Sequence, residues 1–198
     1  MNAQRHLAEL APALDSLAQQ EPVLQRWGRQ LAVLLSTGGR LLAAGNGGSA
    51  AQAQHLTAEI VGRYMRERPP FSAIALHAES SSLTAIVNDY GADEMFARQL
   101  QAHGRPGDIC ILMSTSGSSA NLLTAARRAR DCDLVTWALT GPVPNPLATL
   151  CDEYVYVNGP TTAAVQEVHL VALHLLCEAL DAHLLDGDAA RPVEAVIS

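Results

Sequence analysis

The sequence predicts an α/β protein in which a five-stranded parallel sheet lies between helices, with two further helices at the N-terminus. The chain has 198 residues, of which 48% are hydrophobic, enough for one domain with a buried core and too few for two ordinary domains. From residue 40 onward, short apolar runs alternate with helical stretches. Two of these runs are followed directly by Gly-rich or Ser-rich loops. We therefore expect a three-layer αβα sandwich that forms a single domain over residues 1–198.

Residues 1–37 are predicted to be a helical extension made of two helices. Leucines recur at helical spacing from Leu7 to Leu17, and Pro22 stands near the start of a second stretch with the same periodicity. Gly38-Gly39 ends that stretch, because glycine readily adopts the backbone conformation that terminates helices.

Residues 40–184 carry the predicted α/β core. The predicted strands are 41–44, 73–76, 109–113, 135–139 and 154–157, and the predicted helices lie near 48–62, 81–87, 93–102, 119–131, 145–151 and 162–184. Strands of this length separated by helices are typical of βαβ units and of a parallel sheet covered on both faces. We expect residues 185–198 to form a loose tail.

Composition excludes several classes of function. The 13 basic residues are all arginine and face 20 acidic ones, giving a net charge of −7. Without lysine, the chain has neither a lysine Schiff base nor a Walker A lysine, and an acidic chain without a basic stripe is a poor candidate for binding nucleic acid. No apolar run approaches the length of a membrane span and the first ten residues lack the apolar region of a signal peptide, so we expect no membrane partner and a cytoplasmic location. The four cysteines form no CxxC pair, which fits free thiols in a reducing compartment.

Two loops that follow predicted strands are candidate anion sites. The first is Gly45-Asn46-Gly47-Gly48-Ser49-Ala50, and the second is Ser114-Thr115-Ser116-Gly117-Ser118-Ser119. Each opens a predicted helix, whose N–H groups and dipole favour an anion, and the hydroxyls add donors. One such loop alone is better explained by a turn and an N-cap, but two in equivalent positions favour a phosphate site. The first loop also matches G-x-G-x-x-A, yet Glu79 stands 34 residues after Gly45 rather than about 20, which disfavours a dinucleotide.

Four side chains on two predicted helices are candidates for acid–base chemistry. His55 and Glu59 are four residues apart and share a helix face. Gln166 and His174 are eight apart and share a face of the last helix. A carboxylate beside an imidazole can move a proton between adjacent carbons of a sugar, and the same four groups can bind Zn²⁺. The alternative is that His55 and Glu59 form a surface pair while His174 is an ordinary core histidine.

Two further features have their own interpretations. Asn88-Asp89 follows the predicted helix 81–87 and either forms an Asx turn that caps the next helix or contacts sugar hydroxyls. The sequence does not decide between them. His169 points away from His174 on the same helix, so we expect a structural or interface role.

Taken together, these motifs resemble the sedoheptulose 7-phosphate isomerase (phosphoheptose isomerase) family. The resemblance runs in order from about residue 40 to residue 180. It is carried by Gly45-Asn46-Gly47-Gly48-Ser49, Gln54-His55, Glu59, Gly62-Arg63-Tyr64, Asn88-Asp89, Ser114-Thr115-Ser116-Gly117, Ser119, Gln166-Glu167, His169 and His174.

This resemblance implies the sugar-isomerase (SIS) fold, a flavodoxin-like or Rossmann-like sandwich, assembled as a homotetramer with active sites near subunit interfaces. It implies conversion of D-sedoheptulose 7-phosphate to D-glycero-D-manno-heptose 7-phosphate through an enediol, the first step of heptose biosynthesis. Glu59 is then the base and His174 the partner acid. The implied phosphate ligands are Ser49, Ser114, Thr115, Ser116 and Ser119. The implied sugar contacts are Asn46, Gly47, Gly48, Asn88 and Asp89, with Gln166 also at the substrate. The resemblance further implies one Zn²⁺ per subunit, bound by His55, Glu59, Gln166 and His174.

The sequence departs from the family pattern at two places. Ala163-Ala164-Val165 stands before Gln166 where the family usually has an arginine, and Ser118 stands where asparagine is common. Two other functions share the fold. A sister group binds the replication initiator DnaA, and its pattern lacks the glutamate and the last-helix histidine that are present here as Glu59 and His174. Other SIS proteins sense or isomerise different phosphosugars.

Overall fold

The structure is a computed structural model that describes residues 3–185, so all but the first residue of the predicted tail lies outside the described part of the chain. The helices are α1 (Ala3–Ala18), α2 (Glu21–Ser36), α3 (Gly48–Val61), α4 (Ser80–Tyr90), the 3-10 turn η1 (Ala92–Glu94), α5 (Ala97–His103), α6 (Ala120–Asp131), α7 (Pro146–Leu150) and α8 (Thr162–Leu185). The strands are β1 (Leu41–Gly45), β2 (Ala73–Ala75), β3 (Ile109–Ser114), β4 (Val135–Thr140) and β5 (Glu153–Tyr156).

The five strands form one parallel sheet in the order β2-β1-β3-β4-β5. The predicted fold class is therefore confirmed. The chain passes from β1 to β2 on one side and then to β3 on the other side of β1, so the topological switch point of the sheet lies between β1 and β3. An open α/β sheet binds ligands at the carboxyl ends of the strands beside that point. The two candidate anion loops directly follow β1 and β3, so the topology places them side by side.

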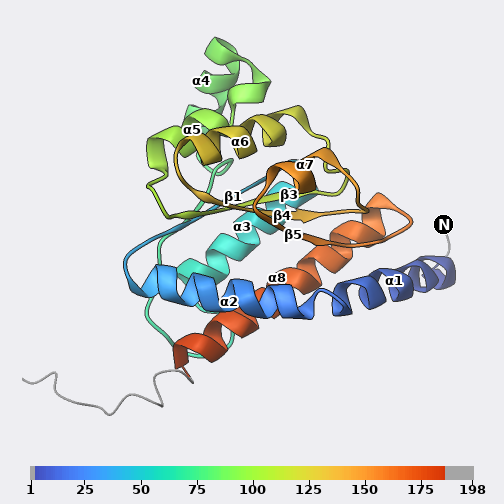
Figure 1. Ribbon diagram of the computed structural model, residues 1–198. Helices are drawn as coiled ribbons and strands as arrows, with labels where there is room; N and C mark the ends of the chain where they lie inside the picture. The colour runs from blue at the N-terminus through green and yellow to red at the C-terminus, as the bar shows by residue number, and fades with distance from the viewer. Residues whose placement is uncertain (1–2, 186–198) are drawn as a thin grey trace, which may run out of the picture.

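The sheet is covered on both faces, which gives three layers (Figure 1). Side chains alternate along β1: Leu41 and Ala43 pack toward α2, α3 and α8, whereas Leu42 and Ala44 pack toward α5 and α6. All five residues of β1 are buried, as expected for a central parallel strand. This explains why the strands read as continuous apolar runs rather than as alternating patterns.

Helix α8 corrects one expectation from the sequence. Over 24 residues it is long and apolar enough to cross a membrane, with a mean hydropathy of 1.5, so the expectation that no stretch approaches that length is wrong. It packs against α1, α2 and α3, and half of its most apolar window is buried inside the protein. The core of the fold accounts for its composition.

The region around α4 also differs from the prediction. The helix expected at 93–102 is divided into η1 and α5, and α4 continues to Tyr90, so Asn88 and Asp89 lie in its last turn rather than in an Asx turn. Glu79 caps α4 by accepting the N–H groups of Ser81 and Ser82. No side chain of α4 is buried, and the helix projects from the top of the molecule in Figure 1.

Candidate active site

The start of α3, which follows the β1 loop, lies directly against α8. Gly47 has a φ of +54°, a left-handed conformation that favours glycine, and it turns the chain into α3. A Cβ added at Gly48 would lie 1.5 Å from Nε2 of Gln166, so the amide of Gln166 rests on the backbone of Gly48. Gln52, one turn further along α3, donates its Nε2 hydrogen to the carbonyl of Gln166. The sequence-predicted Gln166 therefore lies at the N-terminus of α3.

The loop after β3 is a tight turn with exposed hydroxyls. The Oγ of buried Ser114 accepts the N–H of Gly117 at 3.1 Å, which closes the turn. Ser116 is exposed, and Ser119 occupies the N-cap position of α6 without making a side-chain capping bond in the described part of the chain. Their hydroxyls, together with the N-terminal N–H groups of α6, can therefore donate to an anion.

Two asparagines that sequence reasoning missed support these loops. Asn121 of α6 and Asn46 exchange two amide hydrogen bonds, of 2.9 and 3.0 Å, which tie the β1 loop to the β3 loop. Asn145 lies against Gly117, where an added Cβ would come within 2.1 Å of its Oδ1. The Asn145-Pro146 pair could have predicted the N-cap of α7, but nothing in the sequence signals the contact with Gly117.

Two imidazoles and a carboxylate converge between α3 and α8. The Nε2 atoms of His55 and His174 are 3.1 Å apart, and an Oε1 of Glu59 lies 3.4 Å from Nε2 of His55. The ring of Tyr64 packs 5.5 Å from that of His174. The alternative of a surface pair with a separate core histidine is therefore wrong. Since one of two facing nitrogens must accept, at least one imidazole of the hydrogen-bonded pair is neutral, as a proton carrier requires.

The donor set suits zinc in chemistry and in part in geometry. Zinc binds imidazole nitrogen at about 2.0–2.1 Å, so two nitrogens in a tetrahedral site lie roughly 3.3 Å apart, close to the separation of the His55 and His174 nitrogens. As they stand, no three His, Cys, Asp or Glu side chains of the described residues are arranged to hold a metal ion. A third ligand from Glu59 requires its carboxylate to turn toward the pair. The two histidines thus fit a metal, while the full predicted set of four is not assembled.

The predicted sugar contacts on α4 are not joined to this cluster. Asn88 and Asp89 are exposed, and the Asn88 amide donates to the Asp89 carboxylate at 2.8 Å. Within residues 3–185, no hydrogen bond or ion pair links them to His55, Glu59 or His174.

His169 lies apart from the cluster, as the sequence predicts. Its side chain is fully buried, and neither ring nitrogen makes a well-formed hydrogen bond. Burial lowers the pKa of His169 to about 4; the backbone of Thr140 partly offsets this, although the contact falls short of hydrogen-bond geometry. A buried neutral imidazole of this kind is a structural group.

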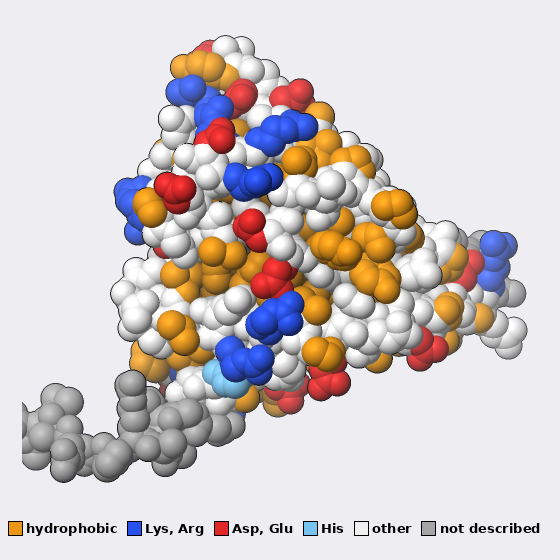
Figure 2. Space-filling view, in the orientation of Figure 1, with side chains coloured by type: hydrophobic (Ala, Val, Ile, Leu, Met, Phe, Trp, Pro, Cys, Tyr) orange, Lys and Arg blue, Asp and Glu red, His pale blue; other side chains and the backbone are white. Residues whose placement is uncertain are grey.

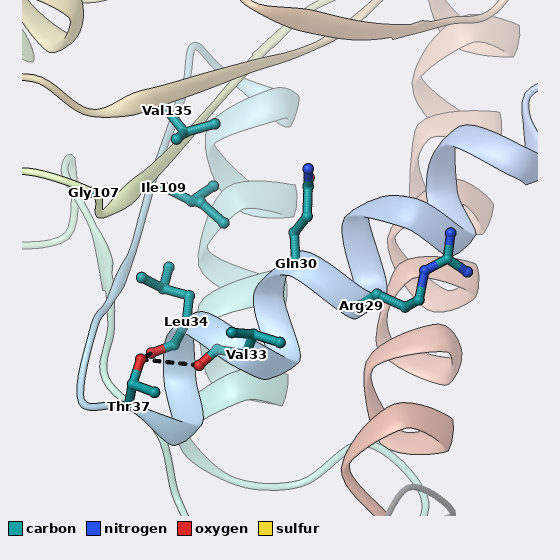
Figure 3. A pocket seen from close by; sticks show the side chains of 8 residues that line it. All are labelled: Arg29, Gln30, Val33, Leu34, Thr37, Gly107, Ile109 and Val135. Carbon is teal, nitrogen blue, oxygen red and sulfur yellow. Dashed lines mark hydrogen bonds between the residues drawn. The ribbon is translucent and has the colours of Figure 1, made fainter.

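Two hollows beside α2 are not lined by His55, Glu59 or His174. One, of about 490 Å³, lies beside α2 at the amino ends of β3 and β4, where Leu34, Ile109 and Val135 surround it (Figure 3). Its lining includes no histidine or acidic residue. On the face drawn in Figure 2, arginines and acidic residues are interspersed rather than gathered into a basic patch. The cluster of His55, Glu59 and His174 therefore lies outside this hollow.

Comparisons with known proteins point to one family. Residues 5–141 match the family model described as the SIS domain. The phosphoheptose isomerase of Streptomyces coelicolor is 62% identical over 183 residues, which cover 92% of this chain and 79% of that protein. Among solved structures, a phosphoheptose isomerase from Francisella tularensis superposes with a TM-score of 0.84 at 32% identity, covering 90% of this chain and 95% of the other. One from Neisseria gonorrhoeae gives a TM-score of 0.77 at 38% identity, covering 90% and 98%.

Proposed function

Because this chain belongs to the phosphoheptose isomerase family of SIS-domain proteins, we propose that it interconverts sedoheptulose 7-phosphate and D-glycero-D-manno-heptose 7-phosphate at a site formed by the loops after β1 and β3 together with α3 and α8. It is an isomerase of heptose biosynthesis. The observation that carries the assignment of the site is the convergence of His55, Glu59 and His174 between α3 and α8, two helices whose N-terminal turns meet at Gly48 and Gln166.

The phosphate group belongs at the loop after β3. Ser116 and Ser119 offer hydroxyls there, Thr115 lies between Ser114 and Ser116 in the same loop, and Ser49 stands at the start of the neighbouring α3. A helix N-terminus stabilises negative charge through its free N–H groups and its dipole. Since the chain has no lysine, these neutral donors carry much of the binding.

The isomerisation moves one proton between carbons and one between oxygens. We assign Glu59 as the base that removes a proton from C1 of the ketose and, after the enediol has formed and the carboxyl proton has exchanged with solvent, delivers a proton to C2. His174 gives a proton to the C2 oxygen and accepts one from the C1 oxygen, and its 3.1 Å contact with His55 supplies an exchange partner. The proposed contacts to the sugar are Asn46, Gly47, Gly48, Asn88, Asp89 and Gln166.

We also propose one Zn²⁺ per subunit, held by His55 and His174 with Glu59 and Gln166. When bound, zinc polarises a carbonyl and orients sugar oxygens. Glu59 and His174 are then shared between acid–base work and metal binding. Calorimetric titration of the protein with Zn²⁺, and of His55→Ala as the control, tests this point: the wild type should bind one equivalent and the variant should bind at least about 10-fold more weakly.

The remaining assignments rest on kinship. We propose a cytoplasmic homotetramer whose subunit interfaces bring further contacts to the site. The function of binding the initiator DnaA is disfavoured, because relatives of 62% and 45% identity are phosphoheptose isomerases and both Glu59 and His174 are present. An isomerase of another phosphosugar is the second candidate.

The test is an isomerase assay with sedoheptulose 7-phosphate, run beside five-carbon and six-carbon ketose phosphates. We expect turnover to be fastest with the seven-carbon substrate. Faster turnover of a shorter sugar would assign the chain to the second candidate, and an inert protein that captures DnaA would overturn the enzymatic assignment.

A further inference from the structure

Arg68 is a buried cation that donates hydrogen bonds to the C-terminal end of α3. Its side chain is 1% exposed, although it lies in the irregular segment between α3 and β2. Its guanidinium donates to the carbonyls of Glu59, Ile60 and Pro69. The last turn of a helix leaves its carbonyls without intrahelical partners, so Arg68 takes the role of a C-terminal cap. One of the capped residues, Glu59, is the proposed base.

The same guanidinium forms an ion pair with α8. Nε of Arg68 lies 2.9 Å from Oδ1 of Asp181, whose side chain is 5% exposed. Asp181 is seven residues beyond His174, close to two full turns, so both side chains lie on one stripe of α8. Helices α3 and α8 are therefore tied at two levels, by His55 with His174 and by Arg68 with Asp181.

We propose that Arg68 and Asp181 are positioning residues that fix the axial register of α3 against α8, and thereby the approach of His55 and Glu59 to His174. The rest of this packing is made by apolar side chains such as Leu56 and Leu173, which allow a helix to slide more readily than a directed ion pair does. The inference rests on the proposed function for its catalytic consequence, whereas the geometric consequence is independent of it.

Removing a buried ion pair can change the register of two helices without lowering the stability of the fold. Replacing both members of such a pair by apolar side chains of similar volume is often neutral or stabilising, because the cost of desolvating two charges disappears. The constraint that the pair places on the axial position of α3 relative to α8 disappears as well. A paired substitution can therefore remove the tie while the fold remains intact.

The experiment compares the double variant Arg68→Met/Asp181→Leu with the matched double variant Arg40→Met/Asp108→Leu. The control also removes an arginine pair with a buried aspartate, and it lies at the amino ends of β1 and β3, opposite the two loops that follow these strands. In the first variant, kcat should fall by about 10–100-fold, the usual effect of removing a supporting partner, while KM changes little because the phosphate loop is not touched. The control should keep the kcat of the wild type.

A crystal structure of Arg68→Met/Asp181→Leu supplies the second readout. The His55–His174 nitrogen separation should exceed the 3.1 Å seen here. A folded variant with an unchanged separation and unchanged kcat would overturn the inference. If this variant does not fold, Asp181→Asn, which keeps an acceptor for Arg68, should retain more than half of the wild-type kcat. A loss of about 10-fold or more in folded Asp181→Asn would also overturn the inference. An inactive wild type would count against the proposed function alone, since the separation can still be measured.

Discussion

Gly48 is the position where one added methyl group should disable the site without weakening the fold. A Cβ there would lie 1.5 Å from Nε2 of Gln166, so the amide must retreat by about 2 Å to reach ordinary van der Waals contact. Gly48 begins α3 and its φ is not positive, so alanine fits the backbone. Alanine in a helix is favoured over glycine by about 0.5–1 kcal/mol, so we expect the free energy of unfolding of Gly48→Ala to be equal to or above that of the wild type.

Activity should respond in the opposite direction. A misplacement of about 1 Å in a catalytic arrangement can lower the rate on the order of 100-fold, so we expect at least that loss in kcat/KM for sedoheptulose 7-phosphate. The control is a double-mutant cycle with Gln166→Ala. If Gly48→Ala acts only by displacing Gln166, the double variant should be no slower than Gln166→Ala alone. Full activity in Gly48→Ala, or fully additive losses, would refute this reasoning.

Three further changes test other parts of the site and core. Glu59→Gln and His174→Gln should each lower kcat by at least ~100-fold in the isomerase assay, and activity near that of the wild type in either variant would remove that residue from the acid–base step. Ser116→Ala should weaken phosphosugar binding by ~1–3 kcal/mol in calorimetry, and unchanged affinity would place the phosphate elsewhere. The pKa of about 4 for His169 lies below the ordinary value of 6.5, so the unfolded chain binds more protons and stability falls as pH drops through this window. Between pH 7 and pH 5, we expect the protonation of His169 to lower the free energy of unfolding, measured with urea, by about 2 kcal/mol, and we expect His169→Gln not to show this loss. Equal pH dependence of the free energy of unfolding in both proteins would contradict the burial argument.

The strands and most helices could be predicted because local chemistry specifies them. Buried parallel strands give short continuous apolar runs, and every predicted strand matches an observed one to within one residue at each end. Helix α4 shows the limit: its end was misplaced by three residues, because an exposed helix without buried side chains has weak apolar periodicity.

The convergence of the site was predictable in part. Spacing placed His55 with Glu59, and the topology of a parallel sheet placed the two loops together. His55 and His174 are 119 residues apart in the sequence, and they face each other only because α3 packs against α8. Hydrophobic periodicity does not specify which helices pack together. The contacts of Asn121 with Asn46, of Asn145 with Gly117 and of Arg68 with Asp181 were missed for the same reason, since the two partners are distant in sequence.

The most direct test of the central assignment is isomerisation in deuterium oxide with analysis of the product by NMR. Proton removal by the Glu59 carboxylate predicts deuterium at C2 of the aldose in the wild type, and no labelled product with Glu59→Gln over the same time. Full turnover without any deuterium at C2, or undiminished labelling by Glu59→Gln, would contradict the account.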